Sequence, residues 1–183
     1  MFKINIVRIG SKAINKDKLY QTIDKIIEMR SKGVSQQEIA DRIGTDRTFV
    51  SRLESLGEVR KGESIAFVAF PVKNKQEITG ILDRYGVNFY LIMTEEERLA
   101  FVREKTGTEL LNSIMDLIVQ ARQCDTVVIF ASDKRGKLIE ALVDCQVIRR
   151  DIGTSPITRD VYIPPQDIIE VMETLQYDRE GQV

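Results

Sequence analysis

The stretch from residue 35 to residue 54, SQQEIADRIGTDRTFVSRLE, constrains the fold more than any other part of the chain. Ser35 followed three residues later by Glu38 is the pattern of a capping box, which predicts a helix start. Gly44 predicts the end of that helix, because glycine adopts the left-handed conformation of a C-cap at little cost. Asp46, or the threonine before it, is placed to cap a second helix. Two short helices around a glycine-bearing turn predict a helix-turn-helix unit.

Apolar spacing predicts which sides of these helices face inward. The expected inward residues are Ile39, Ala40 and Ile43 in the first helix and Phe49, Val50 and Leu53 in the second. A longer helix is predicted over residues 17–32, with Gly33 as its stop. Its apolar stripe consists of Leu19, Ile23, Ile26 and Ile27. This third helix is needed because two short helices alone bury too little surface to be stable.

The segments SQQEIA, IG and RTFVSRLE resemble the DNA-binding helix-turn-helix of the Cro/repressor-like (Xre-type) transcriptional regulators. In that family the second helix enters the major groove of DNA. The resemblance implies double-stranded DNA as partner, and Gln36 matches a position that touches a phosphate or a neighbouring base-reading side chain. Thr45 departs from the family, which more often has an apolar residue there. The DNA-binding residues implied are Gln36, Asp46, Arg47, Thr48, Ser51 and Arg52.

Charge is distributed unevenly along the chain. The net charge is −1, yet residues 1–62 carry an excess of basic side chains and residues 63–183 an excess of acidic ones. This asymmetry fits a DNA-binding domain over 1–62 and a second domain over 63–183 that does not contact DNA. In the connector, Arg60 and Lys61 are either phosphate contacts or solvated linker charges.

Composition limits the chemistry and the location. The chain has no histidine, which excludes Ser-His-Asp and Cys-His catalysis and His-ligated zinc, and leaves carboxylate or lysine chemistry open. Cys124 and Cys145 are too few for a disulfide scaffold and are expected to be reduced and partly buried. We expect no enzyme activity, cofactor or metal. No apolar run is long enough to span a bilayer, and the N-terminus is too polar for a signal peptide, so a cytoplasmic location without a membrane partner is the expectation.

Strand and helix patterns alternate from residue 64 onward. Strands are predicted over 65–70, 87–93, 126–131 and 146–152, in addition to a short strand over residues 2–9 that pairs within the chain or with a second subunit. Alternating strands and helices predict a mostly parallel sheet in a Rossmann-like, three-layer α/β domain. The helices expected between them have these inward residues: Leu110, Leu111, Ile114, Leu117, Ile118 and Ala121 over 106–123, and Leu138, Ile139 and Leu142 after Ser132.

Loops beyond the carboxyl ends of such strands are where ligands bind. The loop ASDKRGK places a serine at a helix N-terminus, where free N–H groups attract anions, and adds basic side chains. A later loop, GTSPITRD, offers hydroxyl donors, although N-cap and turn chemistry explain both loops as well. Neither GxGxxG nor GxxxxGK[ST] is present. The candidate anion- or effector-binding residues are Ser132, Lys134, Arg135, Lys137, Thr154 and Ser155.

The sequence thus predicts a sequence-specific, double-stranded DNA-binding regulator of transcription. It is expected to act as a homodimer, with the C-terminal α/β domain serving self-association or the sensing of a small-molecule effector. One alternative is a small α/β enzyme that carries the helix-turn-helix as a targeting module. Another is a chain whose N-terminal helices dock a protein rather than DNA.

Overall fold

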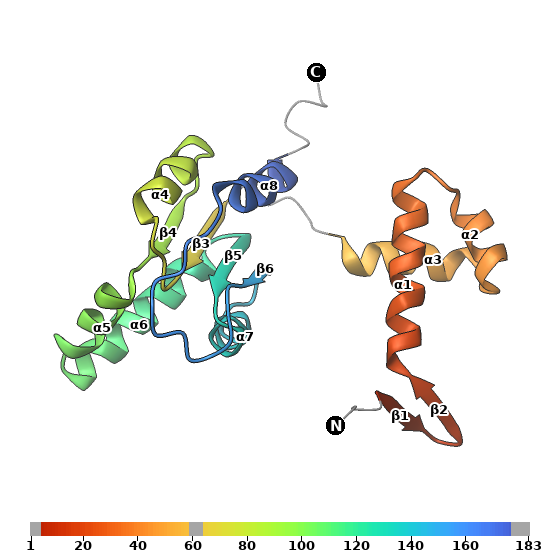
Figure 1. The fold of residues 1–183 in the computed structure, drawn as a ribbon, viewed down its shortest axis with the longest axis horizontal. Helices are drawn as coiled ribbons and strands as arrows, with labels where there is room; N and C mark the ends of the chain where they lie inside the picture. The colour runs from red at the N-terminus through yellow and green to blue at the C-terminus, as the bar shows by residue number, and fades with distance from the viewer. Residues whose placement is uncertain (1–4, 59–63, 177–183) are drawn as a thin grey trace. The chain divides into compact units, whose positions relative to one another are not determined.

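The computed structural model describes residues 5–58 and 64–176 (Figure 1). Contacts divide the chain into two compact units, Met1–Glu58 and Val59–Val183, and each is described by itself. The predicted boundary after residue 62 lies outside the described residues, as do Arg60 and Lys61.

The first unit opens with a hairpin of β1 (Ile6–Ile9) and β2 (Lys12–Asn15), which pair antiparallel. Gly10, with a φ of 59°, takes the first position of the two-residue turn, which requires positive φ in the tight turns that suit hairpins. The strand predicted over residues 2–9 therefore pairs within the chain, and its first residues lie outside the described part. The sequence does not predict β2, because a four-residue strand shows too little alternation.

Three helices follow, α1 (Lys16–Ser31), α2 (Gln36–Ile43) and α3 (Arg47–Gly57). The side chains of Ser35 and Asp46 cap α2 and α3, and Gly44 ends α2 with a φ of 72°, as predicted. Only half of the predicted capping box forms, since the carboxylate of Glu38 accepts from Arg42 at 2.6 Å.

The core of this unit is small. Ile26, Ile39, Ala40 and Val50 are fully buried, with α1, α2 and α3 each contributing. Phe49 was expected inward, but 41 % of it is exposed, and Leu19 and Ile27 of α1 are exposed as well. Leu19 lies in the first turn of α1, and Figure 1 shows that this end of α1 continues beyond α2 and α3 to the hairpin, where no helix lies beside it.

The second unit contains a sheet of four parallel strands, which confirms the prediction of a mixed α/β chain with a parallel sheet. The strands are β3 (Ile65–Ala69), β4 (Phe89–Ile92), β5 (Thr126–Ala131) and β6 (Gln146–Asp151), in the order β4-β3-β5-β6. Every residue of the two central strands, β3 and β5, is buried, as continuous apolar runs predict for strands covered on both faces.

Helices lie against both faces of this sheet (Figure 1). They are α4 (Lys75–Arg84), α5 (Glu95–Arg103), α6 (Gly107–Arg122), α7 (Asp133–Leu142) and α8 (Pro165–Gln176). On one face, residues of α4 and α8 such as Leu82 and Met172 pack in the core that contains Phe67 and Phe130. On the other face, Ala121 and Val143 pack with Val127 and Ile129.

The apolar faces of α6 and α7 are covered less than expected. Leu111 is exposed and faces away from the sheet, so its predicted inward placement is wrong. Ile114, Leu138 and Leu142 are exposed as well, but they line an apolar cavity beside β3 and β4. Among the other residues predicted inward on α6, Ala121 is buried and Leu110, Leu117 and Ile118 are half-buried. The prediction for Leu111 fails because α6 carries apolar residues on two adjacent sides, and periodicity does not tell which side meets the sheet.

Candidate nucleic-acid interface

One side of α3 carries the polar residues expected to read DNA. Arg47, Thr48 and Arg52 are exposed and Ser51 is half-buried, while Val50 points into the core. Ser51 lies four residues after Arg47, and Arg52 lies four residues after Thr48, so each pair shares a side of the helix and the two pairs are adjacent. Within the described part of the chain Arg52 forms no hydrogen bond or ion pair, which leaves its guanidinium free to bind.

A chain of polar contacts ties Arg47 to the rest of the unit. Its Nε donates to Gln36 Oε1 at 3.3 Å, and Gln36 Nε2 donates to Glu54 Oε2 at 2.8 Å. Arg30 completes the chain, because its Nε donates to Glu54 Oε1 and its Nη1 to the carbonyl of Val34 at 2.6 Å. These four side chains, called the polar chain from here on, are Arg47, Gln36, Glu54 and Arg30, and together they link α1, α2 and α3.

Asp46 has a structural task at the start of α3. Its carboxylate accepts from the backbone N–H of Phe49 at 2.8 Å, which satisfies a donor that the helix start otherwise leaves free. A negative charge at this end is also favoured by the helix dipole. Asp46 therefore fixes where α3 begins and hence where Arg47 emerges.

Ion pairing sets the titration of the carboxyl group in the polar chain. The hydrogen bond from Arg30 lowers the pKa of Glu54 from 4.5, and that from Gln36 lowers it further, while partial burial opposes both. Because the folded-state pKa lies below the unfolded-state value, the stabilisation is present above the unfolded pKa. It is lost as the pH falls through the folded-state pKa.

We expect Glu54→Gln to lower the free energy of unfolding by about 1 kcal/mol at neutral pH, because the variant loses hydrogen bonds to a charged group. Urea denaturation followed by circular dichroism at pH 7 and in acid measures this, and the variant and the parent should converge in acid. Glu28→Gln is the control, since Glu28 pairs with Lys32 on an exposed helix surface. Equal losses in the two variants would contradict a stabilising role for the polar chain.

The candidate anion site at the start of α7 is occupied by the protein itself. Ser155 Oγ donates to Ser132 Oγ at 2.8 Å and accepts from the backbone N–H of Lys134 at 3.3 Å. The carboxylate of Asp133 accepts from the N–H of Ser155 at 2.7 Å, and this bond lowers the pKa of Asp133. Ser132 holds the N-cap position, but its side chain makes no capping bond. An anion here would have to displace Ser155 and approach a carboxylate.

The six candidate residues of these loops do not form one site. Ser132 and Ser155 come together, whereas Lys134, Lys137 and Thr154 are exposed to solvent. Arg135 lines an apolar cavity of about 350 Å³ that lies against β3 and β4 and is walled by α5, α6 and α7. Arg98 of α5 also lines this cavity, and sequence reasoning missed it, because the spacing of Glu95 and Arg98 indicates only a pair on one helix.

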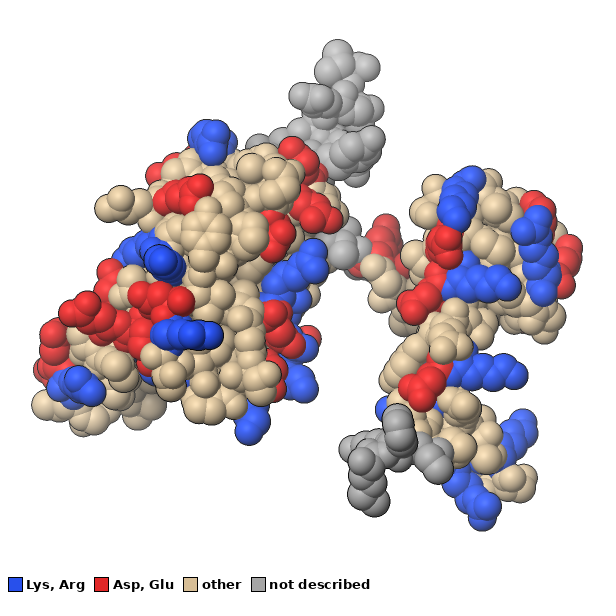
Figure 2. All heavy atoms as spheres, in the orientation of Figure 1, with Lys and Arg blue, Asp and Glu red and all other residues tan. Residues whose placement is uncertain are grey.

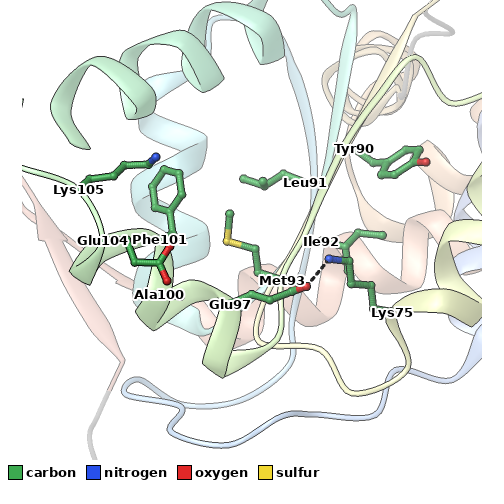
Figure 3. A pocket seen from close by; sticks show the side chains of 10 residues that line it. All are labelled: Lys75, Tyr90, Leu91, Ile92, Met93, Glu97, Ala100, Phe101, Glu104 and Lys105. Carbon is green, nitrogen blue, oxygen red and sulfur yellow. Dashed lines mark hydrogen bonds and ion pairs between the residues drawn. The ribbon is translucent and has the colours of Figure 1, made fainter. Parts of the chain in front are cut away.

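A second hollow, of about 490 Å³, lies over β4 and α5 (Figure 3). Figure 3 shows Lys75 turned toward Glu97, with which it forms an ion pair at 2.7 Å. Lys105 lies over the ring of Phe101 at 5.2 Å, and Glu104 is nearby in the lining. The charges of two lysines and two glutamates cancel, so this hollow favours neither an anionic nor a cationic ligand.

The described residues also limit metal and membrane chemistry. Within residues 5–58 and 64–176, His, Cys, Asp and Glu form no group of three or more that could hold a metal ion. None of the helices described there is long and apolar enough to cross a membrane. Both cysteines are free thiols, Cys124 buried and Cys145 half-buried, and burial raises the pKa of each.

No protein-family model, no curated protein and no solved structure matched the chain.

Proposed function

We propose that the chain is a sequence-specific, double-stranded DNA-binding regulator of transcription that acts as a homodimer. The observation that carries this proposal is the exposure of Arg47, Thr48 and Arg52 on α3, in a unit where α2, Gly44 and α3 form a helix-turn-helix. Polar side chains on the second of two such helices suit the major groove, which is wide enough to admit an α-helix.

The chemistry of these side chains supports two kinds of contact. A guanidinium donates two parallel hydrogen bonds to guanine O6 and N7, or binds a phosphate, and the hydroxyls of Thr48 and Ser51 suit phosphates or either base type. Because Gln36 holds Arg47 at the start of α3, this arginine enters the groove with its direction partly set. Arg52 lies more than one turn further along and reaches a different base pair or the backbone.

The second unit has an acidic surface patch, which disfavours contact with DNA. Figure 2 shows acidic side chains gathered over α5, where Glu95, Glu96 and Glu97 follow one another in the first turn. Such a surface repels the phosphate backbone. The strand order, with helices on both faces, supports a Rossmann-like domain, whose ligands bind beyond the carboxyl ends of the strands.

Selection from random duplex DNA with the purified chain, read by gel shift, tests the proposal. We expect one motif to be enriched, and its two-fold symmetry would reflect a dimer. The logarithm of the affinity should fall linearly with the logarithm of the salt concentration, by about 0.9 for each phosphate contacted. Selection that enriches no sequence would contradict sequence-specific binding. If the chain bound no duplex but bound a protein through its N-terminal helices, the protein-docking alternative would be favoured.

An exposed apolar row on α6 supports self-association. Leu111, Met115 and Val119 are four residues apart, so they form one row, and 52 % of Met115 is exposed. None of the three lines the apolar cavity, whose lining from α6 is the adjacent side of the helix. An apolar row that meets its own copy across a two-fold axis gives the self-complementary contact of a homodimer.

We expect Met115→Glu to convert the dimer into monomers, because a glutamate buried in an apolar contact is costly to desolvate. Sedimentation equilibrium measures this as a change of mass, with the dissociation constant raised at least roughly 100-fold. Gln120→Glu adds the same charge to an exposed position of α6 outside the row and should leave the mass unchanged. A monomeric parent chain, or a dimeric Met115→Glu chain, would show that this row is not the interface.

A further inference from the structure

The apolar cavity against β3 and β4 has a polar end and an apolar end. Phe89 and Leu91 of β4 and Met93 just after it line the cavity, so it runs along this strand. Arg98 and Arg135 come from the first turns of α5 and α7, which place them at the carboxyl end of the sheet. Leu142 and Val143, where α7 ends, mark the opposite, wholly apolar end.

Among the described residues that line the cavity, only Arg98 and Arg135 are charged, and the two are not equivalent. Arg98 donates to both carboxylate oxygens of Glu95, at 2.6 and 2.8 Å. Nη1 of Arg135 is buried and has no hydrogen-bond partner among the residues that the structure describes. Both guanidinium groups line the same end of the cavity, and the charge of Arg135 adds to the bond from Arg98 in lowering the pKa of Glu95.

A buried donor without an acceptor is costly, and more so when it belongs to a charged group. Proteins leave such groups in place where a ligand supplies the partner. Glu95 pairs with Arg98, and the carboxylate of Asp160 accepts from the backbone N–H of Glu95 at 2.6 Å, so the guanidinium of Arg135 is the cationic group of the lining that keeps a donor without an acceptor among the described residues. A group with one negative charge therefore balances it, and a carboxylate matches the planar fork of a guanidinium.

We propose that this cavity binds a small amphipathic monoanion, with its carboxylate on Arg135 and its hydrocarbon or aromatic body between the sheet and α6. The volume of about 350 Å³ lies within the range of small-molecule sites, about 300–1,000 Å³. Apart from the two guanidinium groups, the described residues of the lining are apolar and include Leu117 and Ile118 of α6 and Val68 of β3. This surface suits a body without polar groups.

The site has a consequence for regulation, which rests on the proposed function. α6 lines the cavity with one side and exposes the row of Leu111, Met115 and Val119 on the adjacent side. A ligand that fills the cavity packs directly on the helix proposed to join two copies. Binding then couples to the dimer and through it to DNA.

Isothermal titration calorimetry of the full chain with octanoate and 2-naphthoate, without DNA, tests the site itself. The neutral alcohols of the same shape, octan-1-ol and 2-naphthalenemethanol, are the matched probes. We expect one carboxylate bound per chain, at least roughly 10-fold tighter than the alcohol, which corresponds to about 1.4 kcal/mol. Inorganic phosphate alone should not bind, because it lacks the apolar body.

Variants separate the polar end from the apolar end. Arg135→Met should remove the preference for the carboxylate and leave the affinity for the alcohol unchanged. Arg135→Lys, which keeps the positive charge, should keep part of the preference for the carboxylate. Ile118→Trp fills the cavity and should weaken both probes. Arg84→Met, on α4 outside the cavity lining, is the control and should bind like the parent, and circular dichroism reports whether each variant folds.

Four results would overturn the proposal. Three are no saturable binding of either carboxylate, equal affinity for carboxylate and alcohol, and unchanged carboxylate binding by a folded Arg135→Met chain. The fourth is binding seen only with the monomeric Met115→Glu variant, which would show that a second copy occupies the cavity. Failure of the DNA selection would leave the calorimetric result standing, so the two proposals fail separately.

Discussion

Replacing both Arg47 and Arg52 with alanine is expected to reduce the affinity for the selected duplex on the order of 100-fold or more. Each arginine that pairs with a guanine contributes about 1–3 kcal/mol of discrimination, and the two positions contact different parts of the site. Neither side chain belongs to the buried core, so the variant should fold like the parent. Fluorescence anisotropy with the selected duplex measures the affinity, and circular dichroism checks the fold.

The control for this experiment is Arg84→Ala combined with Arg103→Ala, which removes the same charge from exposed positions on α4 and α5. It should bind DNA like the parent chain. If the folded Arg47→Ala, Arg52→Ala variant bound the duplex as tightly as the control, α3 would not be the reading helix and the regulator proposal would fall.

A large loss of stability is expected from Phe67→Ala in the second unit. Phe67 lies on the central strand β3 with 0 % exposed, and its ring centroid is 5.4 Å from that of Phe130. Removing a buried aromatic ring leaves a cavity that the surrounding sheet and helices cannot close, which costs about 3–5 kcal/mol. Urea denaturation of the full chain measures the loss as a lower transition midpoint.

Tyr162→Ala is the matched control, because it removes an aromatic side chain of which 53 % is exposed. Its loss of stability should be much smaller than that of Phe67→Ala. Similar losses in the two variants would show that the pair of Phe67 and Phe130 is not central to the core.

The helix-turn-helix could be predicted from the sequence because its signals are local. Ser35, Gly44 and Asp46 each act within three or four residues, and the structure places all three at the expected caps. The buried strands β3 and β5 can also be predicted from the sequence, since a short apolar run between turn signals indicates a covered strand. β2 cannot be predicted, because four residues without clear alternation carry no such signal.

The cavity and the exposed row on α6 could not be predicted, for a physical reason. Periodicity identifies an apolar stripe, but α6 is apolar on two adjacent sides, and only tertiary packing decides which side is covered. Arg98 and Arg135 belong to different helices, and their presence in one cavity depends on the arrangement of α5 and α7 about the sheet. The role of Ser155 could not be predicted either, since its hydrogen bonds to Ser132 and Lys134 link two loops that are far apart in the sequence.

The polar chain makes the two arginines of α3 unequal readers. Arg47 is held by Gln36, which is itself held by Glu54, whereas Arg52 has no such tether within the described residues. A restrained side chain loses less entropy on binding and tolerates fewer geometries than a free one. In a collection of bound operators we therefore expect the base pair met by Arg47 to vary least, and the one met by Arg52 to tolerate substitution. Information in the recognised sequence would then be concentrated where the start of α3 enters the groove.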